Sequence, residues 1–551
     1  MALQASPSHE TGPFWPLRKN CAWSHSRSYQ RDALDVIPRE GRSIVVLPCG
    51  GGKTLVGALA AARLRSPTGG APNILVVTYN REAVIQYARN LTENLEIAPF
   101  DVFQYTGSTV ARQKDISLTS GWKLTHFYMI SRGAGTNSNR ESSDYQNYIY
   151  NTTWDAVVVD EAHMAPATHF GESIRQILER ARCVISLTAT YVRAGPHDMD
   201  VMFGFLGNVV YRLKWTDLEK DGYIAKLNFM QIECGLTPRW KAAWDSCVSQ
   251  DKLNVQMLPP SKLEAMVNIV RAHSAHGEIG LIFADGLVVV EQAVRILREE
   301  LKQDWRSVVG DTPAQERDEL FRMLNEGLLP GLFFSRVGEA ATDFRNARIR
   351  YVITVCSAGS SETQFAQRAG RVSRTEYVTS VGESQEAALS RRLATQKEAC
   401  IYDLYTVGTS EELWANGRVR YLVNEGYTFE KRTSEELMSC VVPPLQLYRM
   451  SQEKVDWLLK KMLSKAHDAQ VERRVNEALL NKQREERKDT IERKKRITTM
   501  RTGIMRDRVI SNYRRGQQAR AVGYAEARQA TSDQVRKEMG PARALKLLEM
   551  E

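Results

Sequence analysis

The chain has 551 residues, of which 43% are hydrophobic and 25% are charged, and its formal net charge is +10. A chain of this length is longer than a domain with one ordinary hydrophobic core, which predicts two to four domains. The composition excludes a mostly disordered chain. No run of about eighteen apolar residues and no secretory pattern occur, so we expect neither a membrane-spanning nor an exported protein. The eight cysteines lack zinc-type spacing, which favours a reduced compartment.

Two series of short apolar, β-branched runs predict two parallel sheets. The first series is 43–47, 74–78, 156–160 and 184–188, and the second, after Pro259 and Pro260, is 279–285, 331–337, 349–355 and 399–405. Helix-like intervals separate the runs, as crossover connections between parallel strands require. The sequence therefore predicts an α/β fold with two lobes in tandem.

The expected domain organisation follows from these series. We expect an N-terminal extension at 1–26, a first lobe at 27–232, a connector at 233–261, a second lobe at 262–430 and a basic helical extension at 431–551. From residue 451 onward the chain has 25 Lys and Arg against 15 Asp and Glu, so all of the net positive charge lies there. Such a tail is typical of a solvated helix, and it is also compatible with duplex affinity, a nuclear address or partner docking.

A glycine-rich loop follows the first predicted strand and precedes an apolar helix. It reads Pro48-Cys49-Gly50-Gly51-Gly52-Lys53-Thr54. Glycines let backbone amides and the next helix N-terminus face a triphosphate, with the lysine on the β and γ oxygens and the threonine on Mg²⁺. The loop predicts an ATP site, although proline stands where the usual motif has its first glycine.

Two further motifs of the first lobe fit the same chemistry. The strand at 156–160 ends in Asp160-Glu161-Ala162-His163. At a strand end Asp160 would hold Mg²⁺, Glu161 would orient and deprotonate the attacking water, and His163 would complete the catalytic set. The next strand ends in Thr188-Ala189-Thr190. The hydroxyl groups of this segment could bond the acidic motif and pass on the state of the bound nucleotide.

The second lobe contributes a basic motif, QFAQRAGRVSR, at 364–374. Arg371 and Arg374 are three residues apart, so we expect them on one helix face, as arginine fingers for the γ-phosphoryl group. Gln367 of the same motif is expected to take part in coupling.

Together these motifs resemble superfamily 2 helicases, and the sequence around and between them is similar to the XPB (xeroderma pigmentosum group B) branch. The segments that carry the resemblance are LPCGGGKTLVG, DEAHMAPATHF, SLTATYVR, LKWTDLEKDGYIAKL, LIFADG, SRVG, QRAGRVSR and RVRYLVNEGYTF, within about residues 27–430. The resemblance implies two RecA-like lobes and a nuclear or archaeal ATP- and Mg²⁺-dependent DNA helicase or translocase moving 3′ to 5′. It also implies roles in nucleotide excision repair and transcription, with subunits of a repair or transcription complex as partners.

Further residues are assigned through this resemblance. Gln30 matches a glutamine that reads adenine, and Gly338 and Asp343 match a motif expected at the nucleotide. The positions where contacts to DNA are expected are Thr78, Arg81, Thr106, Gly107 and Arg193.

The chain also departs from that family. Only about 26 residues precede the motor, and Arg193-Ala194-Gly195 stands where the family has Arg-Glu-Asp, so damage sensing and strand separation are in question. A shortened nuclear paralogue accounts for both. Two alternatives stay open: a DEAH-type RNA helicase, since the core motifs do not separate RNA from DNA, and a partner-gated ATPase clamp that does not unwind processively.

Overall fold

The chain divides into two units, Met1–Ala466 and His467–Glu551. The computed structural model describes residues 14–19, 21–25, 27–106, 121–131, 140–165, 170–190, 204–247, 249–335, 344, 346–359, 361–375, 384–440 and 447–462, all within the first unit. Most of the expected basic extension therefore lies outside the described residues, as do Gly107, Arg193, Gly338 and Asp343.

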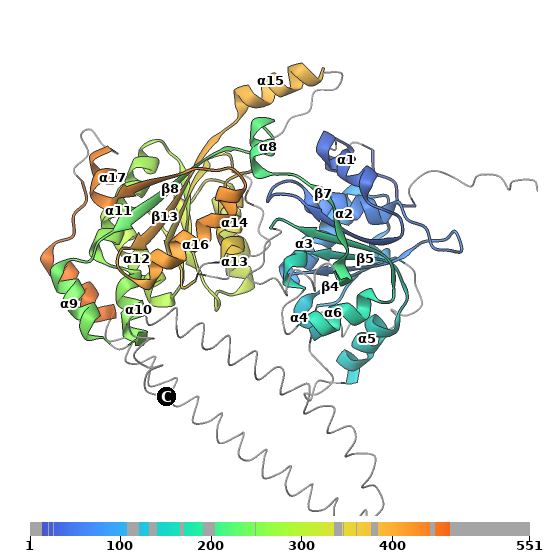
Figure 1. Ribbon diagram of the computed structural model, residues 1–551, viewed down its shortest axis with the longest axis horizontal. Coiled ribbons are helices and arrows are strands. Elements are labelled where there is room, and N and C mark those ends of the chain that lie inside the picture. The colour runs from blue at the N-terminus through green and yellow to red at the C-terminus, as the bar shows by residue number, and fades with distance from the viewer. Residues whose placement is uncertain are drawn as a thin grey trace, which may run out of the picture. The chain divides into compact units, whose positions relative to one another are not determined.

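The described residues contain two seven-stranded sheets, and all the strand pairings in both are parallel (Figure 1). In the first sheet the order is β3-β4-β2-β5-β6-β1-β7. Its strands are β1 (Gly41–Val46), β2 (Asn73–Thr78), β3 (Val102–Gln104), β4 (Gly121–His126), β5 (Trp154–Asp160), β6 (Ala181–Thr188) and β7 (Asn208–Arg212).

The second sheet has the order β10-β11-β9-β12-β13-β8-β14. Its strands are β8 (Lys226–Cys234), β9 (Ile279–Ala284), β10 (Arg306–Val308), β11 (Gly331–Phe334), β12 (Ile349–Cys356), β13 (Glu398–Thr406) and β14 (Phe429–Thr433). The two predicted strand series are thereby confirmed as the central strands of two sheets.

Helices flank both sheets, which makes each a RecA-like lobe as predicted. Those of the first lobe are α1 (Ser28–Val36), α2 (Lys53–Ala62), α3 (Arg81–Asn94), α4 (Phe127–Ser131), α5 (Arg140–Asn151) and α6 (Gly171–Leu178). They are followed by α8 (Trp215–Lys220), α9 (Pro238–Ser246), α10 (Ser249–Met257), α11 (Pro260–Ala275), α12 (Leu287–Leu301), α13 (Ala314–Asn325), α14 (Glu362–Gly370), α15 (Gln385–Thr395), α16 (Ser410–Asn424) and α17 (Ser434–Cys440). A last described helix covers 452–462.

The central strands are buried because helices cover both faces of each sheet. In β5, Val157, Val158 and Val159 are fully buried, and Val157 and Val158 belong to different apolar clusters on opposite faces. Such strands must be apolar at every position, which is why the runs could be found from the sequence.

The boundary between the lobes differs from the expected one. We expected the first lobe to reach residue 232, but β8 pairs with β13 and β14 in the second sheet. The expected connector at 233–261 also packs in the second lobe, where Trp240, Val255 and Leu258 are buried. The chain therefore crosses between the lobes near α8, before β8.

Part of the expected N-terminal extension belongs to the first lobe. Trp15 is buried with its ring 5.7 Å from that of Trp122, and Leu17 forms an isolated bridge with Leu95. Among the described residues, no helix is both long and apolar enough to cross a bilayer. Seven cysteines are free thiols: Cys21, Cys49, Cys183, Cys234, Cys247, Cys356 and Cys400.

Candidate nucleotide site between the lobes

The phosphate loop, residues 48–54, links β1 to the N-terminus of α2. Gly50 and Gly52 both have φ of +80°, a left-handed conformation that side chains with a Cβ rarely adopt. The amide of Gly51 donates to the Pro48 carbonyl over 3.0 Å, which closes the turn. Lys53 and Thr54 then form the first turn of α2, where unpaired amides and the helix dipole favour a bound phosphate.

Gln30 lies directly against this loop. Its Nε2 donates to the Gly51 carbonyl over 3.0 Å, and its Oε1 accepts from the Arg27 amide over 2.8 Å. A Cβ at Gly52 would lie 2.3 Å from Gln30 Nε2, so the glycine leaves the space that the amide occupies. Recognition of adenine by Gln30 stays a prediction, whereas its contact with the phosphate loop is observed.

The acidic residues lie at the carboxyl end of β5. Glu161 Oε2 lies 3.3 Å from His163 Nδ1, and it takes no hydrogen bond from any described residue. Glu161 has φ of +52°, which is strained for a residue with a side chain. Strain of this kind persists only where the surrounding structure imposes it, and it concentrates at functional sites.

Lys53 and the two carboxylates perturb one another. Burial raises the pKa of Asp160, and so does the adjacent Glu161. Burial also opposes ionisation of Glu161, but the charge of Lys53 and the interaction with the His163 side chain outweigh it and lower the pKa of Glu161. For Lys53, burial is outweighed by Glu161 and Cys49, so the pKa lies above its ordinary value. A cationic Lys53 beside ionised Glu161 suits a γ-phosphate and an attacking water.

The SLTAT segment, residues 186–190, contacts the acidic motif. His163 Nδ1 lies 3.3 Å from Thr188 Oγ1, which donates to the Thr190 carbonyl over 2.8 Å. The Leu47 amide, just before the phosphate loop, donates to the Thr188 carbonyl over 3.0 Å. The predicted coupling residues therefore lie between the loop and the acidic motif.

The basic motif of the second lobe reaches the same place, but its geometry differs from the predicted one. Helix α14 ends at Gly370, so Arg371 is its C-cap, and Arg374 lies beyond it in a bridge to Ile224. The two arginines do not share a helix face, because the chain leaves the helix between them. Their charges nevertheless act on the loop: both lower the pKa of Cys49, against the larger opposing effect of burial.

Direct packing joins this motif to the phosphate loop. A Cβ at Gly370 would lie 2.3 Å from Cys49 Cβ, and Ser373 Oγ donates to the Gly370 carbonyl over 3.0 Å and lies 3.5 Å from the Cys49 carbonyl. Gln367, predicted for coupling, lies half-buried on α14. The candidate nucleotide site is thus lined by both lobes.

The residues predicted to contact DNA differ in their exposure. Thr78 is fully buried, with its Oγ1 donating to the Asn80 and Thr125 carbonyls, and Thr106 is 1% exposed. Neither side chain reaches the surface: Thr78 is the last residue of β2, and Thr106 lies two residues after the end of β3. Arg81 is exposed at the first residue of α3.

The residues present fit ATP and Mg²⁺. The phosphate loop turns through two positive-φ glycines into the N-terminus of α2, and Glu161 keeps a buried carboxylate oxygen without a hydrogen bond. Among the described residues no group of three or more His, Cys, Asp or Glu could hold a metal by itself. Mg²⁺ is usually held by one or two protein groups together with phosphates. Thr54 and Asp160 would hold the cation, which would neutralise charge on the phosphates.

Sequence reasoning missed an aromatic cluster beside Gln30. Tyr29 Oη donates to the Gly51 carbonyl over 3.1 Å, and the rings of Tyr29 and Tyr223 lie 5.1 Å apart, edge to face. The guanidinium groups of Arg27 and Arg392 lie 5.2 and 4.3 Å from the Tyr223 ring centroid. Tyr223 lies in the KDGYIAK segment, which drew attention only through the family resemblance.

Comparisons with known proteins agree with this geometry. Residues 218–492 match the family described as ERCC3/RAD25/XPB C-terminal helicase, and residues 24–193 match that described as type III restriction enzyme, res subunit. A solved structure of Dbp5 from Saccharomyces cerevisiae, bound to RNA and ADP BeF3, superposes with a TM-score of 0.51 at 12% identity. It covers 78% of this chain and 93% of that one, and it supports the fold alone.

The curated relatives are helicase/translocase subunits of general transcription and DNA repair factor IIH. The XPB subunit of Enterocytozoon bieneusi is 26% identical over 82% of this chain and 69% of its own length. XPB1 of Arabidopsis thaliana is 28% identical over 74% of this chain and 50% of its own, and XPB/SSL2 of Saccharomyces cerevisiae is 25% identical over 80% and 48%. The chain thus spans about half the length of the plant and yeast relatives.

Proposed function

Because the chain belongs to the ERCC3/RAD25/XPB helicase family, we propose that it is an ATP-driven motor that moves along DNA in the 3′ to 5′ direction. The observation that carries the proposal is the packing of Cys49 in the phosphate loop against Gly370 in the second lobe. A nucleotide site completed by a second lobe makes hydrolysis depend on the arrangement of the two lobes, which is what a motor requires.

The residues divide the work of hydrolysis between the lobes. Lys53 and the amides of the phosphate loop hold the phosphates, and Glu161 orients the attacking water and takes its proton. Arg371 and Arg374 approach from the other lobe and offset the charge that develops on the transferred group. Hydrolysis is therefore fastest when the lobes are together, and product release lets them separate.

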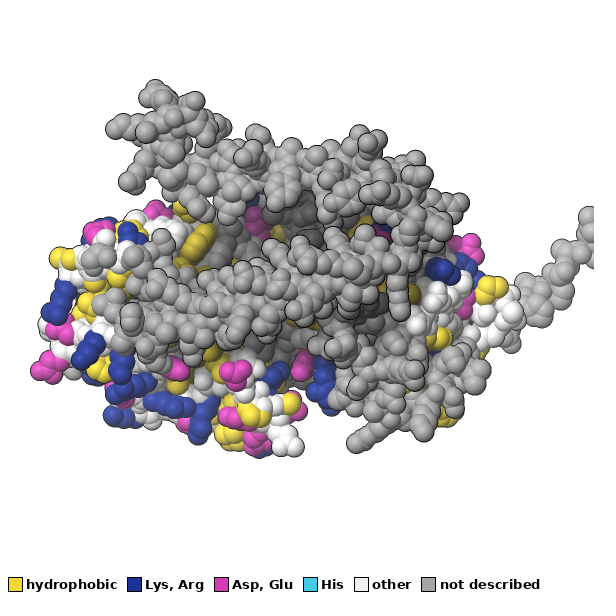
Figure 2. Space-filling view, turned by 90° about the horizontal axis from the view of Figure 1, so that it is seen from below, with side chains coloured by type: hydrophobic (Ala, Val, Ile, Leu, Met, Phe, Trp, Pro, Cys, Tyr) yellow, Lys and Arg dark blue, Asp and Glu magenta, His cyan; other side chains and the backbone are white. Residues whose placement is uncertain are grey.

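Two helix N-termini, one in each lobe, support the proposal that the protein binds a nucleic-acid backbone. Glu82, the second residue of α3, lies 3.5 Å from Arg317, the fourth residue of α13. This ion pair brings the N-terminal turns of one helix from each lobe together, and Arg81 is exposed beside it. Helix N-termini favour phosphate groups without reading bases. Figure 2 shows basic and acidic side chains intermixed on the part of the described surface that is seen there.

The biological setting of the proposal follows the relatives. We place the protein in the nucleus, in nucleotide excision repair or transcription, with subunits of a complex such as general transcription and DNA repair factor IIH as partners. ATP and Mg²⁺ would be its cofactors.

The test compares ATP hydrolysis by the wild-type protein and by Glu161→Gln, alone and with single-stranded DNA, forked duplex and RNA. We expect DNA to raise hydrolysis by the wild type several-fold, RNA to have little effect, and Glu161→Gln to lose about 100-fold or more, because general-base catalysis contributes about 10²–10⁴-fold. Nucleotide binding should survive in the variant. Stronger stimulation by RNA would favour the RNA helicase, and no response to either would favour a partner-gated ATPase.

A further inference from the structure

The SLTAT segment touches the second lobe at two places. Thr190 Oγ1 lies 3.2 Å from Thr363 Oγ1 on α14, and Tyr421 Oη on α16 donates to the Ala189 carbonyl over 2.8 Å. Tyr421 is 2% exposed. Burial and the nearby Glu425 raise the pKa of Tyr421, so the phenol keeps its proton and acts as the donor. The bond thus joins a fixed donor in one lobe to a backbone acceptor in the other.

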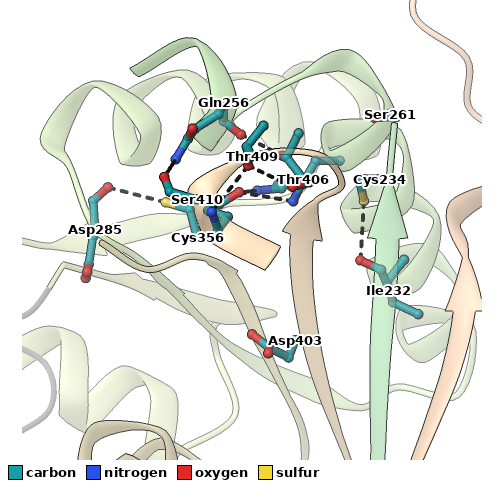
Figure 3. A network of polar contacts seen from close by, with 12 residues as sticks. Ile232, Cys234, Gln256, Ser261, Asp285, Cys356, Asp403, Thr406, Thr409 and Ser410 are labelled. Carbon is teal, nitrogen blue, oxygen red and sulfur yellow. Dashed lines mark hydrogen bonds and ion pairs between the residues drawn. The ribbon is translucent and has the colours of Figure 1, made fainter. Parts of the chain in front are cut away.

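Helix α16 is anchored firmly in the second lobe. Figure 3 shows Gln256, Thr406, Thr409 and Ser410 around its N-terminal end, where Gln256 Nε2 donates to Ser410 Oγ over 2.8 Å and Thr409 Oγ1 donates to the Thr406 carbonyl over 2.8 Å. Two buried ion pairs, Lys262–Glu411 and Arg418–Asp403, add to this anchorage. Because these groups are desolvated and paired, the helix should move with its sheet as one body.

The C-terminal end of α16 also holds the chain where it crosses between the lobes. Glu425 is 2% exposed and accepts from Arg212 Nη2 over 2.9 Å and from the Trp215 amide over 3.2 Å. Thr216 Oγ1 donates to the Glu425 carbonyl over 3.1 Å. Tyr421 therefore lies one helical turn from the crossing, on a helix whose position follows the second lobe.

From Ala189 the contacts lead to the water-activating carboxylate. Thr188 precedes Ala189, bonds the Thr190 carbonyl and lies 3.3 Å from His163, which in turn lies 3.3 Å from Glu161. A displacement of Ala189 would shift the Thr188 hydroxyl and so the support of His163.

We propose that Tyr421 is a positioning residue that ties the SLTAT segment to the second lobe, so that the placement of Glu161 depends on how the lobes are arranged. The inference rests on the proposed function, to which it adds the side chain through which α16 acts on the hydrolytic site. Tyr421 Oη bonds the Ala189 carbonyl and no group that would hold a phosphate, so the effect should fall on the rate of hydrolysis more than on the binding of ATP.

The experiment measures DNA-stimulated ATP hydrolysis by the full chain as Tyr421→Phe, which removes only the hydroxyl. Tyr405→Phe is the matched control, because Tyr405 Oη donates to Glu233 Oε1 entirely within the second sheet. We expect kcat of Tyr421→Phe to fall about three- to tenfold, the kinetic equivalent of one hydrogen bond, with the KM for ATP changed less than about twofold. Tyr405→Phe should keep both values, and thermal unfolding should be similar for the two variants.

A double-mutant cycle tests the path itself. Thr188→Val removes the hydroxyl next to His163, and in that background Tyr421→Phe should cost nothing further, because both changes break one chain of contacts. The inference is overturned if Tyr421→Phe hydrolyses ATP like the wild type, if Tyr405→Phe loses as much, or if the two effects are additive. A wild-type protein with no DNA-stimulated hydrolysis would overturn the proposed motor, and this inference with it.

Discussion

The contact between the phosphate loop and Gly370 can be disturbed by a single methyl group. In Gly370→Ala the new Cβ would lie 2.3 Å from Cys49 Cβ and 3.1 Å from Cys49 Sγ. Gly370 is the last residue of α14 and its φ is not positive, so alanine suits its backbone. The substitution therefore strains the contact between the lobes and leaves the helix intact.

The size of the effect follows from the overlap. Carbon atoms rest at about 3.5–4.0 Å from each other, so the loop and α14 must separate by more than about 1 Å. A misplacement of about 1 Å at a reacting centre can cost about 100-fold in rate. We expect DNA-stimulated kcat to fall by about that factor, while ATP affinity changes little because the first lobe holds the phosphates.

The assay is steady-state ATP hydrolysis with saturating DNA, together with binding of a fluorescent nucleotide. Gly235→Ala is the control, since nothing lies within 4 Å of a Cβ there. The double variant Cys49→Gly, Gly370→Ala lacks the Cys49 Cβ that the new methyl group would contact. Compared with Cys49→Gly alone, it should lose less of the rate than Gly370→Ala loses compared with the wild type. If Gly370→Ala hydrolyses ATP as fast as Gly235→Ala, the idea that the site closes through this contact is refuted.

Two further predictions follow from the buried charges. Lys262→Met leaves the carboxylate of Glu411 buried without its cation, which should cost about 3–5 kcal/mol of unfolding free energy in urea. Glu398→Gln, at the exposed pair with Lys226, should cost little, and equal losses would contradict the reasoning. At limiting Mg²⁺, hydrolysis should fall as the pH drops toward the raised pKa of Asp160, because protonation removes the charge that holds the cation. Excess Mg²⁺ should move this fall to lower pH, and a pH profile that does not respond to Mg²⁺ would exclude Asp160 as a ligand.

The sequence predicted the central strands because burial on both faces leaves an unmistakable pattern. Edge strands were missed for the opposite reason: β14 reads FEKRT and is largely exposed or half-buried, so nothing marks it as a strand. Strand β8 alternates between buried and exposed positions, but its pattern cannot tell which sheet it joins. The boundary between the lobes was therefore misplaced.

The site was predictable where local motifs determine local geometry. The phosphate loop and Asp160-Glu161 lie at strand ends, as their spacing indicates. The arrangement of Arg371 and Arg374 was not predicted: α14 ends at Gly370, which packs against Cys49, far away in the sequence. The roles of Tyr223 and Tyr421 depend equally on contacts between segments about 190 or more residues apart, for which one sequence carries no signal.

In the proposed function, ATP hydrolysis drives movement along DNA. The most direct measurement is the ATP-dependent displacement of a third strand from triplex-forming duplex DNA, since a motor can remove it without separating the duplex. We expect the wild-type protein to displace the strand only when ATP and Mg²⁺ are present, and Glu161→Gln to bind the same DNA without displacing it. Displacement by Glu161→Gln, or none by a wild-type protein that hydrolyses ATP in response to DNA, would contradict a motor.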